Sequence, residues 1–348
     1  MTALRDRFRG CLLGGATGDA LGAGIEFMPL AEIRDRFGPA GVTGYVPAYR
    51  RTGAITDDTQ MTLFTAEALI RARCLPGGSG QADVPALWRA YQRWRLTQSA
   101  GGDDAARERS HGKDGWLLTQ EFLWQQRSPG TTCLSALSLG PPGSMTARVN
   151  DSKGCGGVMR VAPIGLVAAD PFTLGCQAAA LTHGHPAGYL AAGAFAVMVA
   201  ELARGARLPD AAAAGITRLQ AAEHGTEVTR ALTKAVQAAG TEPPVPQTLA
   251  RLGEGWVAEE ALAIATYCAL VATDFRSGVL LAVNHGGDSD STGAICGNLL
   301  GTHLGARAID IDLLTGLEGR DVIEQIADDL HGVFTGGRRP LEERYPPG

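Results

Sequence analysis

The sequence predicts an all-α fold, and two observations lead to this prediction. Segments rich in alanine, leucine and methionine carry their apolar residues at helical spacing, whereas alternating valine, isoleucine and threonine runs of the kind found in strands are scarce. The polar breaks between these segments contain the glycine and proline residues that end helices. We expect helices over residues 190–204, 211–222, 228–239 and 258–272.

A chain of 348 residues is long enough for one large domain, and its composition is that of a globular protein, with 45% hydrophobic and 19% charged residues. Irregular stretches are expected at residues 76–83, 99–113 and 241–247. None of them separates regions of different composition. We therefore expect one compact domain over residues 1–348, with a frayed tail over 336–348.

The spacing of glycine predicts two closely packed helices. Glycines recur at every fourth position in two distant segments: Gly10, Gly14, Gly18 and Gly22, then Gly293, Gly297 and Gly301. Residues four apart share one face of a helix, so each series leaves a groove where another backbone can approach. Each glycine costs a helix about 1 kcal/mol relative to alanine, which close packing must offset. The alternative is that some of these glycines lie in loops.

Charge and cysteine content argue against several classes of function. The formal net charge of −5 provides no basic surface for nucleic acid or for an anionic membrane. The seven cysteines are scattered and none forms a C-x-x-C pair, which is typical of reduced thiols in a cytoplasmic protein. Residues 1–10 lack the pattern of a secretory signal, and the apolar runs at 189–200 and 261–272 are too short to span a bilayer. We expect neither nucleic acid nor membrane as a partner.

The strongest chemical signal is a pair of acidic clusters. Asp57 and Asp58 follow Thr56, a suitable N-cap, and precede the apolar run 61–70; a second cluster of aspartates and hydroxyls lies within residues 284–292. Four carboxylates flanked by hydroxyls, without histidine or cysteine at metal spacing, indicate a hard cation such as Mg²⁺ or Mn²⁺. They could neutralise two ions. The alternative for each cluster by itself is plain helix capping.

A third segment, residues 150–165, has three glycines around Cys155. A loop of this kind can direct backbone N–H groups at an anion such as a pyrophosphate. A plain turn before a helix that begins near Pro163 is the alternative. No Cys/His/Asn pattern supports Cys155 as a nucleophile.

Taken together, these segments resemble the ADP-ribosylglycohydrolase family. The resemblance lies in residues 10–27, 55–69, 150–166, 181–196 and 284–301, which run in the family's order. Residues 127–137 and 252–265 are similar to the bacterial branch that includes immunity proteins against ADP-ribosylating toxins.

The resemblance implies an orthogonal helical bundle with two Mg²⁺ or Mn²⁺ ions in a cleft. The metal ligands that it implies are Thr56, Asp57, Asp58, Asp288, Asp290 and Ser291; many relatives have threonine in place of this serine. The catalytic residues that it implies are Glu26, Asp57, Asp58 and Asp290. The substrate-binding residues that it implies are Gly154, Cys155, Gly156, Gly157 and His183, although the family varies at Lys153 and Cys155. Asp19 is interpreted as structural, and Trp256 as either packing or part of the site.

The function implied is hydrolysis of the N-glycosidic bond of ADP-ribosyl-arginine on a modified protein, with release of ADP-ribose and with Glu26 moving the proton. Three alternatives remain: another ADP-ribose linkage (serine or a free ADP-ribose derivative), a protein that binds ADP-ribose or blocks a toxin, and a metal-free carboxylate-pair glycosidase. The expected partners are mono-ADP-ribosylated protein, ADP-ribose and a cognate ADP-ribosyltransferase toxin.

Overall fold

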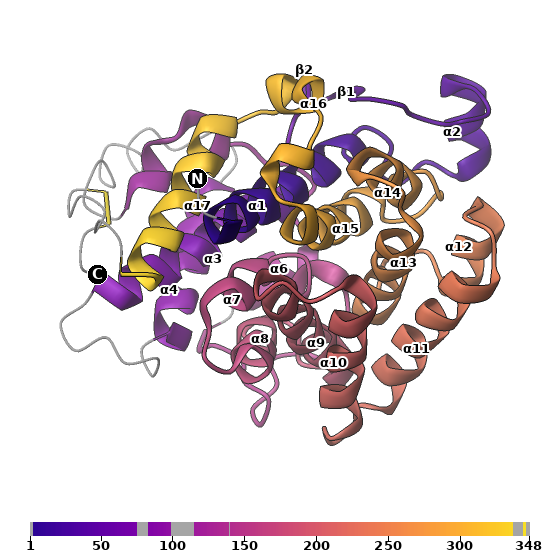
Figure 1. Cartoon of the computed structure of the whole chain (residues 1–348). Coiled ribbons are helices and arrows are strands. Elements are labelled where there is room, and N and C mark those ends of the chain that lie inside the picture. The colour runs from indigo at the N-terminus through magenta and orange to yellow at the C-terminus, as the bar shows by residue number, and fades with distance from the viewer. Residues whose placement is uncertain (1–2, 75–82, 99–114, 139, 337–343, 346–348) are drawn as a thin grey trace.

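The computed structural model describes residues 3–74, 83–98, 115–138, 140–336 and 344–345. The chain is 68% helical, so the predicted all-α fold is confirmed. Its helices run in many directions around a continuous apolar core (Figure 1). The irregular stretch expected at 99–113 and most of the one at 76–83 lie outside the described residues.

The elements are as follows. The α-helices are α1 (Ala3–Gly22), α2 (Leu30–Phe37), α3 (Asp57–Cys74), α4 (Asp83–Thr97), α6 (Thr131–Ser138), α7 (Ala162–Val167), α8 (Pro171–Ala180), α9 (Pro186–Ala203), α10 (Leu208–Gln220), α11 (Thr226–Thr241), α12 (Pro246–Leu252), α13 (Ala258–Val271), α14 (Phe275–Val283), α15 (Ser289–Leu304), α16 (Ile311–Gly316) and α17 (Arg320–Phe334). The 3-10 helices are η2 (Trp116–Thr119), η3 (Glu121–Leu123), η4 (Cys155–Gly157) and η5 (Ala306–Ala308). A short antiparallel pair joins β1 (Pro47–Ala48) to β2 (Arg51–Thr52), with Pro47 opposite Thr52 and Ala48 opposite Arg51.

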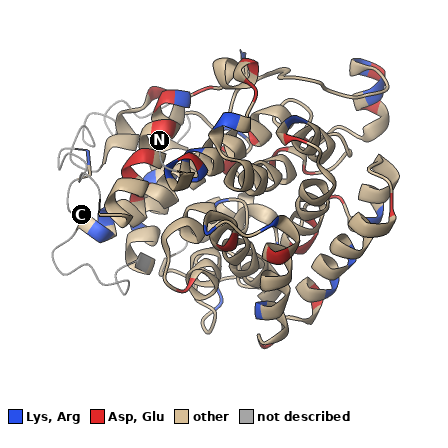
Figure 2. Ribbon diagram, in the orientation of Figure 1, with Lys and Arg blue, Asp and Glu red and all other residues tan. Residues whose placement is uncertain are grey.

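The four helices expected from apolar spacing are present as α9, α10, α11 and α13, and the expected break lies between α11 and α12. The apolar run at 189–200 is part of α9, which at 18 residues has the length and hydropathy of a membrane span, so the expectation that this segment is too short is wrong; 94% of α9 is buried inside the fold. It is therefore a core helix. Basic and acidic residues are intermingled along the helices (Figure 2).

The glycine series bring α1 and α15 into backbone contact, as their spacing predicts. The facing pairs are Gly10 with Gly301, Gly14 with Gly297, and Gly18 with Gly293. A Cβ atom added at any of these glycines would overlap a carbonyl oxygen of the other helix. Between the glycines, the Asn298 amide donates to the carbonyl oxygen of Cys11 at 2.8 Å. This contact fixes the register of the two helices that flank the site.

The end of the chain packs against α17 where the structure describes it. Tyr345 is 3% exposed, and its hydroxyl donates to Asp329 Oδ2 at 2.8 Å. Arg344 forms an ion pair with the same carboxylate at 2.7 Å. Asp329 and the apolar core give these two residues partners, and residues 337–343 and 346–348 of the tail predicted to fray lie outside the described residues.

Asp328 on α17 fastens α1, since its carboxylate accepts hydrogen bonds from both Arg5 and Arg9. Burial by itself would raise the pKa of Asp328, but the hydrogen bonds from the two arginines outweigh it and hold that pKa well below its usual range. A lowered folded-state pKa stabilises the fold above the unfolded value of about 3.9, and this contribution is lost as the pH falls further. We expect Asp328→Asn to cost about 1 kcal/mol near neutral pH.

Urea unfolding at pH 7 and at pH 3 measures this effect, and the difference between wild type and variant is expected to shrink at the lower pH. Glu201→Gln, which removes an exposed ion pair with Arg204, is the control and is expected to change stability by less than about 0.5 kcal/mol. A loss from Asp328→Asn that is equal at both pH values would contradict the prediction.

Candidate active site

Five carboxylates converge on one cleft with a volume of about 370 Å³. Glu26 follows the end of α1, Asp57 and Asp58 begin α3, and Asp288 and Asp290 lie at the start of α15. The backbone contact of α1 with α15 thus brings together acidic residues from opposite ends of the chain. The four aspartates are at most 4% exposed.

Asp19 on α1 positions the start of α3. Its carboxylate accepts hydrogen bonds from the backbone N–H groups of Thr56 at 3.0 Å and Thr59 at 3.1 Å, and also from the Thr59 hydroxyl. It is completely buried and does not line the cleft. The interpretation of Asp19 as a structural residue agrees with these contacts, which orient Asp57 and Asp58 toward the cleft.

A buried ion pair supports the same turn from its other side. The guanidinium of Arg127 contacts Glu318 Oε2 at 2.9 Å and donates to the carbonyl oxygen of Ile55 at 3.0 Å. The carbonyl oxygen of Arg127 accepts the Asp57 N–H at 3.0 Å. Three residues further on, the Gly130 N–H donates to Asp57 Oδ2 at 3.2 Å. Asp57 is therefore fixed by both its backbone and its carboxylate.

Asp288 is fixed by its place at the N-cap of α15. Its carboxylate accepts the Ser291 N–H at 3.4 Å, and its own N–H donates to the carbonyl oxygen of Glu254 at 2.8 Å. A side chain at Gly287 would overlap that same carbonyl oxygen, so the segment before α13 lies directly on the segment before α15. This contact holds the segment that carries Trp256, which lines the cleft, against the start of α15.

The electrostatics of the cleft favour the binding of a cation. Burial raises the pKa of Glu26 to about 11 and raises the pKa values of Asp57, Asp58 and Asp288, and repulsion from Asp290 is the next cause in each case. In the described part of the chain, no lysine or arginine forms an ion pair with any of the five. Glu26 Oε2 and Asp58 Oδ1 are buried without a hydrogen-bond partner. Hard oxygen donors in this state fit a divalent cation.

The tightest group of candidate ligands joins Glu26 to Asp288 and Asp290, each with a carboxylate oxygen within 4.8 Å of the others. Glu26 was expected to move a proton, and its position also allows it to contact a metal ion. Ser291 lines the cleft, whereas Thr56 lies behind the lining and accepts the Asp58 N–H at 3.3 Å. Of the predicted metal ligands, Asp57, Asp58, Asp288, Asp290 and Ser291 line one cleft and Thr56 does not, and Asp57 and Asp58 lie outside the group that comes within 4.8 Å.

The glycine loop lines the cleft through Gly154, Cys155 and Gly156, next to the segment that carries Trp256. Gly157 does not line it, because this residue packs against α8, where an added Cβ would lie 3.0 Å from that of Ala179. The prediction that backbone N–H groups of this loop are free to bind an anion is wrong at two positions. The Cys155 N–H donates to the carbonyl oxygen of Trp256 at 3.2 Å, and the Gly154 N–H donates to Ser152 Oγ at 3.3 Å.

His183 lines the cleft beside this loop with a neutral imidazole. Burial and the nearby charge of Arg160 lower its pKa to about 3. Its Nδ1 lies 2.8 Å from the Thr182 hydroxyl, so Nε2 remains to face the cleft beside Gly154. A neutral ring suits hydrogen bonding to a ligand better than charge pairing.

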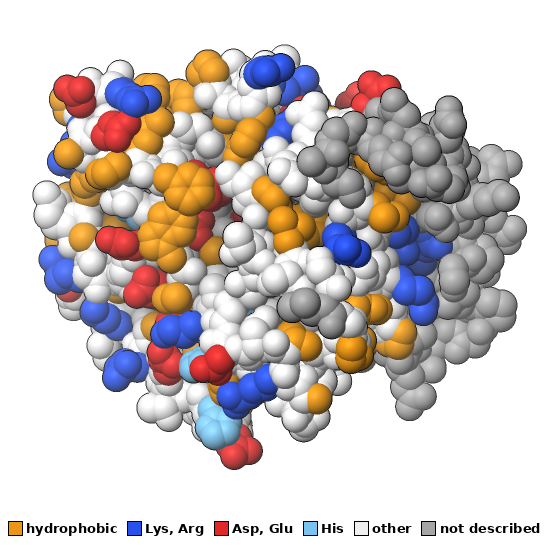
Figure 3. All heavy atoms as spheres, turned by 180° about the vertical axis from the view of Figure 1, so that it is seen from behind, with side chains coloured by type: hydrophobic (Ala, Val, Ile, Leu, Met, Phe, Trp, Pro, Cys, Tyr) orange, Lys and Arg blue, Asp and Glu red, His pale blue; other side chains and the backbone are white. Residues whose placement is uncertain are grey.

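Two aromatic rings form the mouth of the cleft. Phe27 and Trp256 stack with centroids 5.3 Å apart and planes inclined by 15°, and their side chains are 67% and 36% exposed. Figure 3 shows hydrophobic and acidic side chains lying side by side on the face opposite that of Figure 1. Our sequence reasoning did not single out Phe27, although its position next to Glu26 was a usable signal.

Ser128 is a second residue that the sequence reasoning missed. It lines the cleft, its hydroxyl lies 2.5 Å from Tyr49 Oη, and its hydrogen bond to Glu26 opposes the rise in the pKa of that carboxyl. It belongs to the 127–137 stretch that carried part of the family resemblance. Its place in that stretch was the signal from which Ser128 could have been identified.

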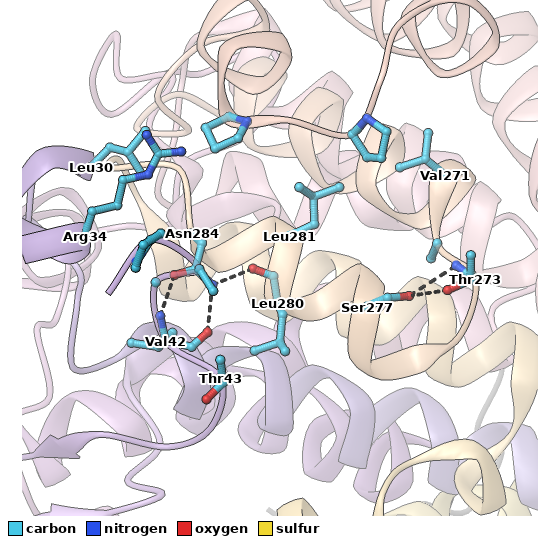
Figure 4. A pocket seen from close by; sticks show the side chains of 16 residues that line it. Leu30, Arg34, Val42, Thr43, Val271, Thr273, Ser277, Leu280, Leu281 and Asn284 are labelled. Carbon is cyan, nitrogen blue, oxygen red and sulfur yellow. Dashed lines mark hydrogen bonds between the residues drawn. The ribbon is translucent and has the colours of Figure 1, made fainter. Parts of the chain in front are cut away.

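A second cavity, of about 480 Å³, lies between α2 and the α12–α14 region (Figure 4). Asn284 closes its base by bonding both backbone groups of Val42 and the carbonyl oxygen of Leu280. Among the described residues, no carboxylate lines this cavity, and most of its lining is apolar. The acidic cleft is therefore the candidate active site.

The comparisons with known proteins agree with this geometry. The family model described as ADP-ribosylglycohydrolase matches residues 1–340. The chain is 28% identical to the ADP-ribosyl-[dinitrogen reductase] glycohydrolase of Rhodospirillum rubrum, over 91% of this chain and 92% of that protein. It is 32% identical to the ADP-ribosylarginine hydrolase Tri1 of Pseudomonas putida, over 34% of this chain and 30% of that protein.

A solved structure, titled ADP-ribosylglycohydrolase-related protein complex, superposes with a TM-score of 0.66 at 26% identity and covers 95% of this chain and 99% of that one. The sequence match, the fold and the acidic cleft all point in the same direction. The chain belongs to the ADP-ribosylglycohydrolase family.

Proposed function

We propose that this protein hydrolyses the N-glycosidic bond between ADP-ribose and an arginine side chain of a modified protein. The observation that carries the proposal is the cleft itself, in which buried carboxylates without cationic partners lie beneath an exposed aromatic pair. The carboxylates suit the charge changes of glycoside hydrolysis, and the rings suit a planar cation.

Two divalent ions, Mg²⁺ or Mn²⁺, are proposed as cofactors. The residues that would hold them are Asp57, Asp58, Asp288, Asp290 and Ser291, with Thr56 behind them and Glu26 within reach. When bound, such ions polarise oxygen ligands and lower the pKa of water. The five carboxylates supply enough negative charge to balance both ions.

The chain's own residues place the substrate and move the proton. A carboxylate oxygen of Glu26 lies within 4.8 Å of oxygens of Asp288 and Asp290, and Glu26 is proposed to exchange a proton with the reacting groups. His183 and the loop at Gly154, which line the same cleft, are proposed to hold the ADP-ribose. The apolar sides of the rings exclude water from the leaving group.

The aromatic pair supports arginine as the leaving group. A guanidinium is planar and cationic, and it stacks on aromatic faces, whereas a serine side chain offers no surface to stack. The partial matches to proteins named ADP-ribosylarginine hydrolase give the same indication. We expect Trp256→Ala to lower kcat/KM for arginine-linked substrate about tenfold, chiefly through KM.

Phe37→Ala is the control for this prediction, because Phe37 is also 36% exposed but does not line the cleft. Steady-state release of ADP-ribose measures both variants, and Phe37→Ala is expected to behave as wild type. Equal losses in the two variants, or an unchanged KM in Trp256→Ala, would count against stacking on the substrate.

The test of the function is release of ADP-ribose from arginine-modified and from serine-modified protein, each with Mg²⁺ or Mn²⁺ and with EDTA. Metal-dependent release from arginine is the expected result. Release from the serine-modified protein alone would show that serine, not arginine, is the linkage, and would leave the proposed metal centre standing. Full activity in EDTA would favour a metal-free carboxylate pair as the catalyst.

The partners proposed are mono-ADP-ribosylated protein and ADP-ribose, in the cytoplasm, where the seven free cysteines stay reduced. A cognate ADP-ribosyltransferase toxin is a further proposed partner, supported by the similarity of residues 127–137 to the immunity branch. Capture of such a toxin by the Asp290→Asn variant would separate direct blocking from catalysis.

A further inference from the structure

A fully buried arginine contacts the residue that precedes His183 in the chain. Arg160 is 0% exposed, and no carboxylate of the described residues forms a hydrogen bond with its guanidinium. The guanidinium lies over the Tyr91 ring, 4.2 Å from its centroid, and donates to the carbonyl oxygen of Ala178 at 2.9 Å. Its other strong contact is to the Thr182 hydroxyl oxygen at 2.7 Å. A buried cation without a carboxylate therefore acts on the neighbour of a cleft residue.

This contact decides the direction in which the Thr182 hydroxyl donates. A guanidinium can only donate, so the Thr182 oxygen accepts from Arg160 and its own proton must go to another acceptor. His183 Nδ1 lies 2.8 Å from that oxygen, whereas the carbonyl oxygen of Ala179 lies at 3.5 Å. The longer distance exceeds the range of about 2.5 to 3.0 Å for an O–H···O hydrogen bond. The hydroxyl therefore donates to Nδ1, and the positive charge behind it strengthens that donation.

The hydrogen bond at Nδ1 sets the tautomer of the His183 ring. A neutral imidazole carries one proton, and because Nδ1 accepts, that proton lies on Nε2. Nε2 lies 3.5 Å from the position that a Cβ at Gly154 would take, and no described residue forms a hydrogen bond with it. His183 is 1% exposed and lines the cleft. An N–H group left unpaired in so buried a residue indicates an acceptor that a ligand supplies.

We propose that Arg160 and Thr182 are positioning residues that hold His183 as a hydrogen-bond donor, with Nε2–H directed at an oxygen of the substrate. The inference rests on the proposed function and narrows it, because His183 then accepts no proton from the reacting groups and proton transfer is left to the carboxylates. The buried charge of Arg160 also favours a substrate oxygen that carries negative charge.

Nuclear magnetic resonance of protein with nitrogen-15-labelled histidine tests the tautomer directly. Long-range proton–nitrogen correlation spectra show which ring nitrogen carries the proton, and the spectrum of His183→Gln identifies the His183 signals among those of the seven histidines. At neutral pH we expect wild-type His183 to be protonated on Nε2, with Nδ1 unprotonated and hydrogen-bonded. This readout does not depend on catalysis, on the linkage or on metal.

Thr182→Val, which has nearly the same shape as threonine but no hydroxyl, tests the link between Thr182 and the ligand. The Nδ1 signal of His183 should shift to that of a nitrogen without a hydrogen bond, and the Kd for ADP-ribose measured by calorimetry should rise about tenfold. Thr182→Ser restores the hydroxyl and should restore both the signal and the affinity. A purely structural role for Thr182 would leave the Nδ1 signal unchanged.

Thr266→Val is the matched control, because the Thr266 hydroxyl is also buried but has no hydrogen-bond partner and does not line the cleft. It should keep the wild-type His183 spectrum and affinity. A wild-type ring protonated on Nδ1, or unchanged ADP-ribose affinity in Thr182→Val, would overturn the inference and leave the proposed function standing. Wild type that neither binds nor releases ADP-ribose would overturn the proposed function and, with it, the role of His183 toward the substrate.

Discussion

Asp290→Asn is expected to abolish turnover while making the metal-free protein more stable. Repulsion from Asp290 is the largest charge effect on Glu26, Asp57, Asp58 and Asp288, so removing its charge relieves all four. We expect a gain of about 1 to 2 kcal/mol in unfolding free energy without metal. Turnover should fall about a thousandfold or more, because the stabilisation that a bound ion supplies is worth several kcal/mol.

Thermal unfolding with EDTA and with Mn²⁺ measures the two opposing effects. Wild type is expected to gain stability on addition of metal, whereas Asp290→Asn should start higher in EDTA and gain little. Asp312→Asn, an exposed aspartate paired with Arg276 outside the cleft, serves as the control and should keep full activity and the full response to metal. Full turnover in Asp290→Asn would refute the assignment of the metal centre.

Gly18→Ala is expected to destabilise the fold strongly although it adds only one methyl group. The added Cβ would overlap the carbonyl group of Gly293 and lie 3.1 Å from the Ala294 nitrogen, all of which are backbone atoms of α15 that cannot rotate away. The two helices must separate, and we expect a loss of about 3 kcal/mol or more. The carboxylates at the ends of both helices would be displaced, so metal affinity should fall as well.

Gly240→Ala on α11 is the matched control, because nothing lies within 4 Å of its added Cβ. It should leave stability unchanged or raise it by up to about 1 kcal/mol, since alanine favours helix over glycine. Denaturant unfolding compares the two. A Gly18→Ala protein within about 1 kcal/mol of wild type would show that α1 and α15 tolerate separation.

The sequence predicted the parts of the fold that follow from periodic patterns. Helical spacing of apolar residues located α9, α10, α11 and α13, and the four-residue glycine period predicted the close packing of α1 with α15. The start of α3 was also predictable, since Thr56 followed by two aspartates is a helix N-terminus signal. Each of these signals is local in the chain or repeats at a fixed interval.

The features that escaped prediction depend on single long-range contacts. The carboxylate of Glu26 lies near those of Asp288 and Asp290 only in the folded chain. No sequence pattern around residue 26 indicates the distance between these carboxylates. The N–H of Cys155 is taken by a carbonyl oxygen about a hundred residues later, which removes it from the expected cradle. Likewise, Tyr345 is held by one hydrogen bond to Asp329. Such contacts have no periodicity that a sequence could reveal.

The contact of α1 with α15 also determines when during synthesis the site can exist. Asn298 bonds a residue 287 positions earlier in the chain, so α1 leaves the ribosome long before its partner is made. At about 5–20 residues per second, this interval lasts about 15 to 60 seconds. The nascent chain therefore gains its acidic cleft only after α15 has been made, and a truncated product that lacks α15 should bind no metal ion.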